Sequence, residues 1–232
     1  MSEGQGAPGW HGKLPSLGDF ASRRLDAGFV EAWDTWLAAG LLALRERDAE
    51  GWLAAYLATP SWRFLLMPGV LPGDCGRQGW AGVLMPSVDR VGRYFPLSIV
   101  LPLGAQPAST QQMRSLWNWL GRLDELAADA LHDDWSPERL EDELERMAGP
   151  GLDVLAGAGG SPGAAPGTVV ELALPPGVDA ALAIGIEAQS LWCAHAAGRA
   201  YWYASSELQP PRLLVSNGLP PAAALLGATI PA

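Results

Sequence analysis

The sequence predicts an α/β (α+β) fold, in which a central, mostly antiparallel sheet is flanked by helices on both faces as an α-β-α sandwich. Short apolar runs bounded by Gly and Pro follow one another in the middle third of the chain. Their connections are too short for crossover helices, which favours antiparallel pairing. Amphipathic helical patterns stand on either side of that third. Hydrophobic residues make up 49% of the 232, enough to fill one sizeable core.

The N-terminal part predicts a short tail, a shaped loop and two helices. Residues 1–9 are polar and Gly-rich and are expected to be flexible, so we place a single domain over 10–232. Residues 10–20 contain Gly and Pro and predict a loop, or a short strand and turn. A helix follows, and residues 51–58 predict a shorter one that Pro60 ends. The first helix has an apolar stripe at i, i+4 and i+7 spacing, formed by Phe29, Trp33, Leu37, Leu41 and Leu44.

The middle of the chain predicts three strands and then two helices. The strands are expected over 61–67, 79–85 and 95–103. Ser109 and Gln112 form a capping box that begins a long amphipathic helix, and Ser136 followed by Pro137 begins another that ends near Met147. The apolar stripe expected on the long helix consists of Met113, Leu116, Trp117, Leu120, Leu123 and Ala127.

The last third begins with a low-complexity Gly/Ala/Pro-rich connector at 149–167. Beyond it we expect a hairpin around Gly198, formed by strands over 191–197 and 199–205. The other expected elements are a strand over 168–174, a segment with a helical lean over 179–189, a strand over 212–216 and a short helix over 221–227.

Charge and composition exclude several classes of protein. The net charge is −10, whereas nucleic acid and anionic membrane surfaces attract basic proteins. No apolar stretch reaches the length of a membrane span, and the first residues lack a signal-peptide core. Two cysteines are too few for a disulfide scaffold, although one bridge between Cys75 and Cys193 stays open. We therefore expect a cytoplasmic protein without membrane insertion or a nucleic-acid partner. Most of the 11 tryptophans are expected to be core anchors.

The chain offers little catalytic chemistry. Ser161 stands in a G-x-S-x-G string, but Pro162 and a Gly/Ala-rich tail follow where a nucleophile elbow requires a helix. The three histidines are scattered and show no metal-ligand spacing. We predict no catalytic residues, no metal and no cofactor. The enzymatic alternative is a serine hydrolase using Ser87 or Ser161, and it requires a histidine within hydrogen-bond distance of the serine.

Residues 124–145 form an acidic segment with ten acidic residues and one basic residue, Arg139. A solvated outer face of two helices would explain this charge. A docking surface for a basic partner is the alternative, because a field of one sign steers encounter.

Two loops hold the remaining polar residues of interest. The turn between the strands at 79–85 and 95–103 places an aspartate among arginines. It is either an Asp/Arg network that satisfies a buried turn or a recognition loop. The opening loop is interpreted in the same way. The residues expected to contact a partner are Trp10, Lys13, Ser16 and Asp19 in the first loop and Ser87, Asp89, Arg90 and Arg93 in the second.

Several long strings resemble the TagF/ImpM family of type VI secretion-associated proteins. They are GWHGKLPSLGDFASRRL at 9–25, WDTWL at 33–37, PSWRFLLMPGV at 60–70 and GVLMPSVDRVGRYFPL at 82–97, with weaker similarity in SLW at 190–192 and NGLP at 217–220. The resemblance implies an antiparallel sheet sandwiched by helices. It also implies a non-enzymatic, cytoplasmic repressor that acts after translation by binding the forkhead-associated (FHA) scaffold protein of the secretion apparatus.

The resemblance also bears on a phosphatase found in some relatives and on an alternative function. Some relatives carry a fused PppA-type phosphatase, and here we expect any such phosphatase to be a separate protein. The alternative function is a structural or assembly subunit of the secretion apparatus, which would co-purify with the assembled machine.

Overall fold

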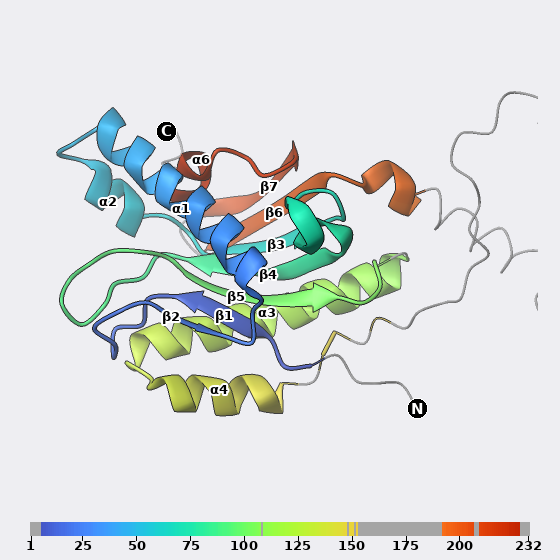
Figure 1. The fold of residues 1–232 in the computed structure, drawn as a ribbon, viewed down its shortest axis with the longest axis horizontal. Helices are drawn as coiled ribbons and strands as arrows, with labels where there is room; N and C mark the ends of the chain where they lie inside the picture. The colour runs from blue at the N-terminus through green and yellow to red at the C-terminus, as the bar shows by residue number, and fades with distance from the viewer. Residues whose placement is uncertain are drawn as a thin grey trace, which may run out of the picture.

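The computed structural model describes residues 6–107, 109–147, 149–150, 152, 192–206 and 209–227. Within these residues, seven strands form one sheet in the order β2-β1-β5-β4-β3-β6-β7, and every neighbouring pair is antiparallel. The fold is therefore α+β with an antiparallel sheet, as predicted (Figure 1). The strands are β1 Gly9–Gly12, β2 Ala21–Arg23, β3 Trp62–Leu66, β4 Gly79–Met85, β5 Leu97–Leu103, β6 Arg199–Ser206 and β7 Gln209–Asn217. The helices are α1 Ala27–Arg47, α2 Trp52–Leu57, the 3-10 helix η1 Gly73–Arg77, α3 Thr110–His132, α4 Pro137–Arg146 and α6 Ala222–Leu226.

Helices cover both faces of the sheet and divide the core into two clusters. The first cluster joins one sheet face to α1, α2, η1 and α6, and the second joins the other face to α3 and α4. All seven residues of β4 are buried, because this central strand is covered on both faces. The sandwich expected from the sequence is the observed arrangement.

The helix signals in the sequence act as predicted, with one difference in α3. The Ser109 hydroxyl accepts a hydrogen bond from the Gln112 backbone N–H at 3.1 Å, and the Ser136 hydroxyl accepts one from the Arg139 N–H at 3.3 Å. On α3, Trp119 is fully buried, whereas Trp117 of the expected stripe is only half-buried. The stripe is rotated because α3 packs on β3 and β4 along the face that carries Trp119.

Two expectations near residue 198 are wrong. Residues 192–196 are helical, whereas a strand was expected over 191–197. Gly198 is not the turn of a hairpin, since β6 instead pairs with β7. Gly198 has φ +74°, and its N–H donates to the Pro68 carbonyl at 2.6 Å. This glycine therefore links the helical turn to the start of β6.

Other expectations fall at the boundaries of the described chain. The strand expected over 168–174 and the helical lean over 179–189 lie outside the described residues, as do most of the connector and Ser161. Gly9, expected in the flexible tail, is the first residue of β1. Cys75 and Cys193 are both free thiols. No helix of the described segments has the length and apolar content needed to cross a bilayer.

The tryptophans serve as core anchors, as predicted. Several buried or half-buried indoles donate to atoms far away in the sequence. Trp33 Nε1 donates to the Ser98 hydroxyl at 2.8 Å, and Trp62 Nε1 donates to the Leu225 carbonyl at 3.1 Å. The fully buried tryptophans are Trp10, Trp33, Trp62, Trp80, Trp119 and Trp202.

Candidate functional site

The two loops singled out in the sequence meet at one end of the sheet. Residues 13–20 join β1 to β2, and residues 86–96 join β4 to β5. In Figure 1 both loops extend beyond the same end of the sheet, at the left. The backbone N–H of Arg90 donates to the Leu17 carbonyl at 2.8 Å, which joins the two loops directly. We refer to residues 13–20 and 86–96 together as the loop cluster.

Asp89 is the centre of the loop cluster. Its carboxylate accepts from the Lys13 ammonium at 2.5 Å and from Arg93 Nε at 2.7 Å. It also accepts from the backbone N–H groups of Val91 at 3.0 Å and Arg93 at 2.9 Å. Asp89 and Lys13 are buried, so this is an ion pair inside the protein. The Asp/Arg network expected for a buried turn is present for Arg93 but not for Arg90, whose side chain does not bond to Asp89, and Lys13 is its other cation.

The protonation of Asp89 follows from these contacts. Desolvation by burial favours the neutral acid and is the largest single effect on this carboxyl. The hydrogen bonds from Lys13, Arg93 and Val91 together outweigh it and hold the pKa of Asp89 well below its usual range. Asp89 is therefore a permanent carboxylate at neutral pH, matched to the charges of Lys13 and Arg93.

Ser87 is held in place by backbone and side-chain partners. Its hydroxyl donates to the Lys13 carbonyl at 2.7 Å. Its N–H donates to the Tyr56 hydroxyl oxygen at 2.8 Å, and that hydroxyl donates back to the Ser87 carbonyl at 3.0 Å. Desolvation by burial raises the pKa of Tyr56, so the phenol stays protonated and available as a donor. Ser87 thus fixes the base of the second loop to the first.

Residues of the acidic segment form hydrogen bonds with the first loop, with β1 and with β3. Trp10 Nε1 donates to the Glu141 carboxylate, which also pairs with Arg24. Ser16 Oγ donates to the Trp135 carbonyl at 2.7 Å. Asp124 accepts from Arg63 Nε at 2.9 Å. Part of the acidic segment is therefore structural, whereas Glu125, Asp129, Asp133, Asp134, Glu138, Asp142 and Glu145 are exposed.

The eight residues expected at the partner contact separate by burial. Trp10, Lys13, Ser87 and Asp89 are buried, because each is bonded to the opposite loop or to α4, and Ser16 is half-buried. Asp19, Arg90 and Arg93 are exposed. In this conformation the buried residues position the loops, and only the exposed residues present side chains to a partner.

Two apolar residues missed by the sequence reasoning belong to the same surface. Val91 is 64% exposed at the tip of the second loop, and Phe20 is 46% exposed at the end of the first. Phe20 lies under the Lys13 ammonium, which is 4.2 Å from its ring centre. A groove of about 500 Å³ runs from Leu17 and Phe20 to Pro137 at the start of α4. The sequence signal was an apolar residue beside charged ones within a turn.

The histidine nearest these loops, His11 in β1, contacts Asp34 on α1 and the Phe20 ring of the first loop. His11 Nε2 lies 3.3 Å from Asp34 Oδ1, and its ring stacks on Phe20 with centres 6.2 Å apart. The Ser87 hydroxyl donates to a carbonyl and has no histidine partner among the described residues, so the condition for a Ser87 hydrolase is not met there. The described residues also hold no group of three His, Cys, Asp or Glu side chains suited to a metal ion.

Comparisons with known proteins show one family model and one solved structure to which the chain is similar. The family model for the TagF N-terminal domain, type VI secretion system-associated, matches residues 9–147, a range that contains the whole loop cluster. Among solved structures, the chain is similar to PA0076 from Pseudomonas aeruginosa PAO1, determined as a crystal structure at 2.05 Å resolution. The identity is 31%, the TM-score is 0.71, and the match covers 97% of this chain and 98% of that one. No curated protein matches the chain.

Proposed function

Because the chain belongs to the TagF family of type VI secretion-associated proteins, we propose that it is a non-enzymatic repressor of type VI secretion. It acts after translation by binding the FHA scaffold protein and keeping it from the secretion apparatus. The main support for this proposal is the family match over residues 9–147. The protein would bind the scaffold in the cytoplasm.

The bonding within the loop cluster supports binding rather than catalysis. Two groups that could act as nucleophile or cation are engaged within the cluster: the Ser87 hydroxyl by the Lys13 carbonyl, and the Lys13 ammonium by Asp89. A catalytic group must be free to exchange a proton or a bond with substrate. These groups instead hold two loops in one conformation.

The exposed tip of the loop cluster supplies a surface suited to a protein partner. Arg90 makes no side-chain hydrogen bond or ion pair to any residue that the structure describes, and Val91 is exposed beside it. Arginine is one of the residue types enriched among those that dominate binding energy at protein interfaces. The buried Asp89 network preorganises the tip, which lowers the entropy lost on binding.

The proposal is tested by deletion and by co-purification. In a deletion strain we expect secretion to become constitutive, because the scaffold is no longer held back. Secretion that stays regulated would overturn the proposal, and secretion that is abolished would favour an assembly subunit.

A variant then tests the surface. We expect Arg90→Glu to weaken co-purification with the scaffold, and Arg122→Glu, an equal charge change at an exposed position on α3, to leave it unchanged. Both variants should unfold at the same urea concentration as the parent. Equal scaffold binding by all three proteins would move the contact away from this tip.

A further inference from the structure

A second concave surface lies at the opposite end of the sheet from the loop cluster. It is a groove of about 870 Å³ between the N-terminal half of α1, η1 and the segment after β7. In Figure 1, η1 lies toward the right end of the sheet, away from the loops at the left, and α1 runs from the middle of the sheet toward the upper left. We refer to this surface as the α1–η1 groove. It shares no lining residue with the loop cluster.

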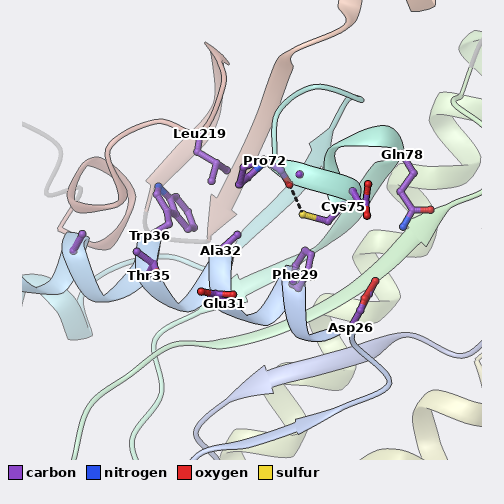
Figure 2. Close-up of a pocket in the computed structure, with 14 residues that line it drawn as sticks. Asp26, Phe29, Glu31, Ala32, Thr35, Trp36, Pro72, Cys75, Gln78 and Leu219 are labelled. Carbon is purple, nitrogen blue, oxygen red and sulfur yellow. Dashed lines mark hydrogen bonds between the residues drawn. The ribbon is translucent and has the colours of Figure 1, made fainter.

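The floor of the α1–η1 groove is apolar and belongs to the packed core. Phe29 and Cys75 are buried there, and Trp36 is half-buried. Figure 2 shows Phe29, Ala32 and Trp36 along α1, facing Pro72, Cys75 and Leu219. A concave apolar floor with this volume has room for a few side chains of a ligand.

Hydrogen bonds fix the floor before any ligand arrives. Trp36 Nε1 donates to the Pro220 carbonyl at 2.7 Å, which ties α1 to the segment after β7. The Cys75 thiol donates to the Pro72 carbonyl at 2.8 Å, and the Cys75 carbonyl accepts from Trp80 Nε1 at 2.8 Å. The groove is therefore preformed, which reduces the entropy that binding costs.

The rim of the α1–η1 groove is acidic. The 14 described residues that line it include Asp26, Glu31 and Asp74, and none of them is Lys, Arg or His. Asp26 does not cap α1 with its side chain, and Glu31 forms no ion pair with any described residue. Asp74 pairs with Arg77 at 3.0 Å, but both side chains are more than 80% exposed, so water screens that pair.

The carboxylates also act on the floor itself. Desolvation by burial raises the pKa of the Cys75 thiol, and the nearby charges of Asp26 and Asp74 raise it further. The groove thus combines an apolar floor with a negative field directed at whatever occupies it.

We propose that the α1–η1 groove docks a segment of a partner protein that carries apolar side chains flanked by Lys or Arg. Charge complementarity selects this occupant, because three carboxylates with no opposing cation in the lining attract a basic segment. A second copy of this chain fits poorly, since each copy has a net charge of −10. This site goes beyond the proposed scaffold contact and does not depend on it.

The test uses the full chain and two synthetic amphipathic peptides with the same Leu/Ala pattern. One peptide carries Lys at its polar positions and the other carries Glu. Binding is measured by calorimetry and by the NMR shift of the Trp36 indole N–H. We expect the Lys peptide to bind and shift that signal, and the Glu peptide to do neither.

Two double variants separate the groove from general charge attraction. We expect Glu31→Lys with Asp74→Lys to weaken the Lys peptide about tenfold. Glu125→Lys with Asp129→Lys changes the net charge equally on the exposed side of α3, and we expect less than about a twofold effect from it.

Several results would overturn the proposal. They are failure of the Lys peptide to bind, equal weakening by both double variants, and equal binding of the two peptides. A dimer that Glu31→Lys with Asp74→Lys abolishes would assign the groove to a second copy instead.

Discussion

At one end of the sheet, the loop cluster uses most of its polar side chains in bonds between its own two loops. At the other end, the α1–η1 groove leaves carboxylates facing solvent around an apolar floor. The loop cluster is rich in polar residues in the sequence, yet Lys13, Ser87 and Asp89 are all buried. The groove has no comparable motif, because its lining comes from segments far apart in the chain.

Polar residues gathered in a loop of the sequence therefore do not by themselves indicate a binding surface. A charged residue near complementary charges is often satisfied internally, because an unpaired buried charge is costly. A binding surface instead requires side chains that the fold leaves unsatisfied, such as Arg90, or a hollow formed where elements do not fill the space between them.

Removing the floor of the α1–η1 groove should have the largest effect on stability. Phe29 is fully buried and packs on Trp80, with ring centres 4.3 Å apart. Phe29→Ala should therefore lower the free energy of unfolding by about 4 kcal/mol in a urea titration. Thr35→Ala, on the exposed wall of the same groove, should stay within about 0.5 kcal/mol of the parent. A small effect for Phe29→Ala would show that the floor is not part of the core.

Breaking the buried ion pair of the loop cluster should come next. Lys13→Met removes the ammonium and leaves the Asp89 carboxylate with Arg93 and two backbone N–H groups. The expected loss in the free energy of unfolding is about 3 kcal/mol, the lower end for a broken buried pair. Urea unfolding measures this loss. An unchanged free energy of unfolding for Lys13→Met would mean that the ion pair contributes nothing to holding the two loops together.

Acid should lower the free energy of unfolding through His11. Desolvation by burial lowers the pKa of His11 from 6.5, and the bond to Asp34 only partly opposes this. The folded protein then holds the neutral ring while the unfolded chain binds a proton, so stability falls as the pH drops below 6.5. His11→Gln should reduce that slope in urea titrations on both sides of this pH. Identical slopes would place the pH dependence on other groups.

Charge reversal at the exposed tip should have the smallest effect on stability. Arg90→Glu should change the free energy of unfolding by no more than about 0.5 kcal/mol, because the Arg90 side chain makes no hydrogen bond or ion pair with the residues that the structure describes. Arg93→Glu should cost more, since it would place a carboxylate against Asp89. Sequence reasoning treats the two arginines alike, and the structure separates them. Equal unfolding midpoints for the two variants would mean that the bond from Arg93 to Asp89 adds no stability beyond what Arg90 provides.

The sequence predicts the elements of this fold better than their arrangement. Local signals identify α1, α3 and α4, because Ser109, Ser136 and the apolar spacing act within a few residues. The place of β1 between β2 and β5 depends on long-range pairing, for example of Trp10 with Ile99. The sequence predicts a strand over 191–197 where the structure has a helix over 192–196, because a short apolar run such as the one containing Trp192 does not separate strand from helix.

The same limit applies to the candidate site. The sequence identifies Arg93 as a partner of Asp89, because a spacing of four residues places the two in one turn, but the same reasoning wrongly includes Arg90. It does not identify Lys13 as the third member, since Lys13 is 76 residues away and reaches Asp89 only through the pairing of β1 with β5 and β5 with β4. Phe20 and Val91 escape notice for a related reason, because exposure is a property of the assembled loops.

The buried position of Lys13 also determines which chemical probes suit this protein. Lys13 is the only lysine of the chain, and it is 2% exposed. Amine-directed cross-linkers therefore find no accessible lysine on the folded surface, and a failure to cross-link a partner through lysine says nothing about binding. Carboxylate-directed or photoactivated reagents have many exposed targets, including Asp26 and Glu31. The rate at which Lys13 is acylated would in turn measure how often the loop cluster opens and exposes this side chain.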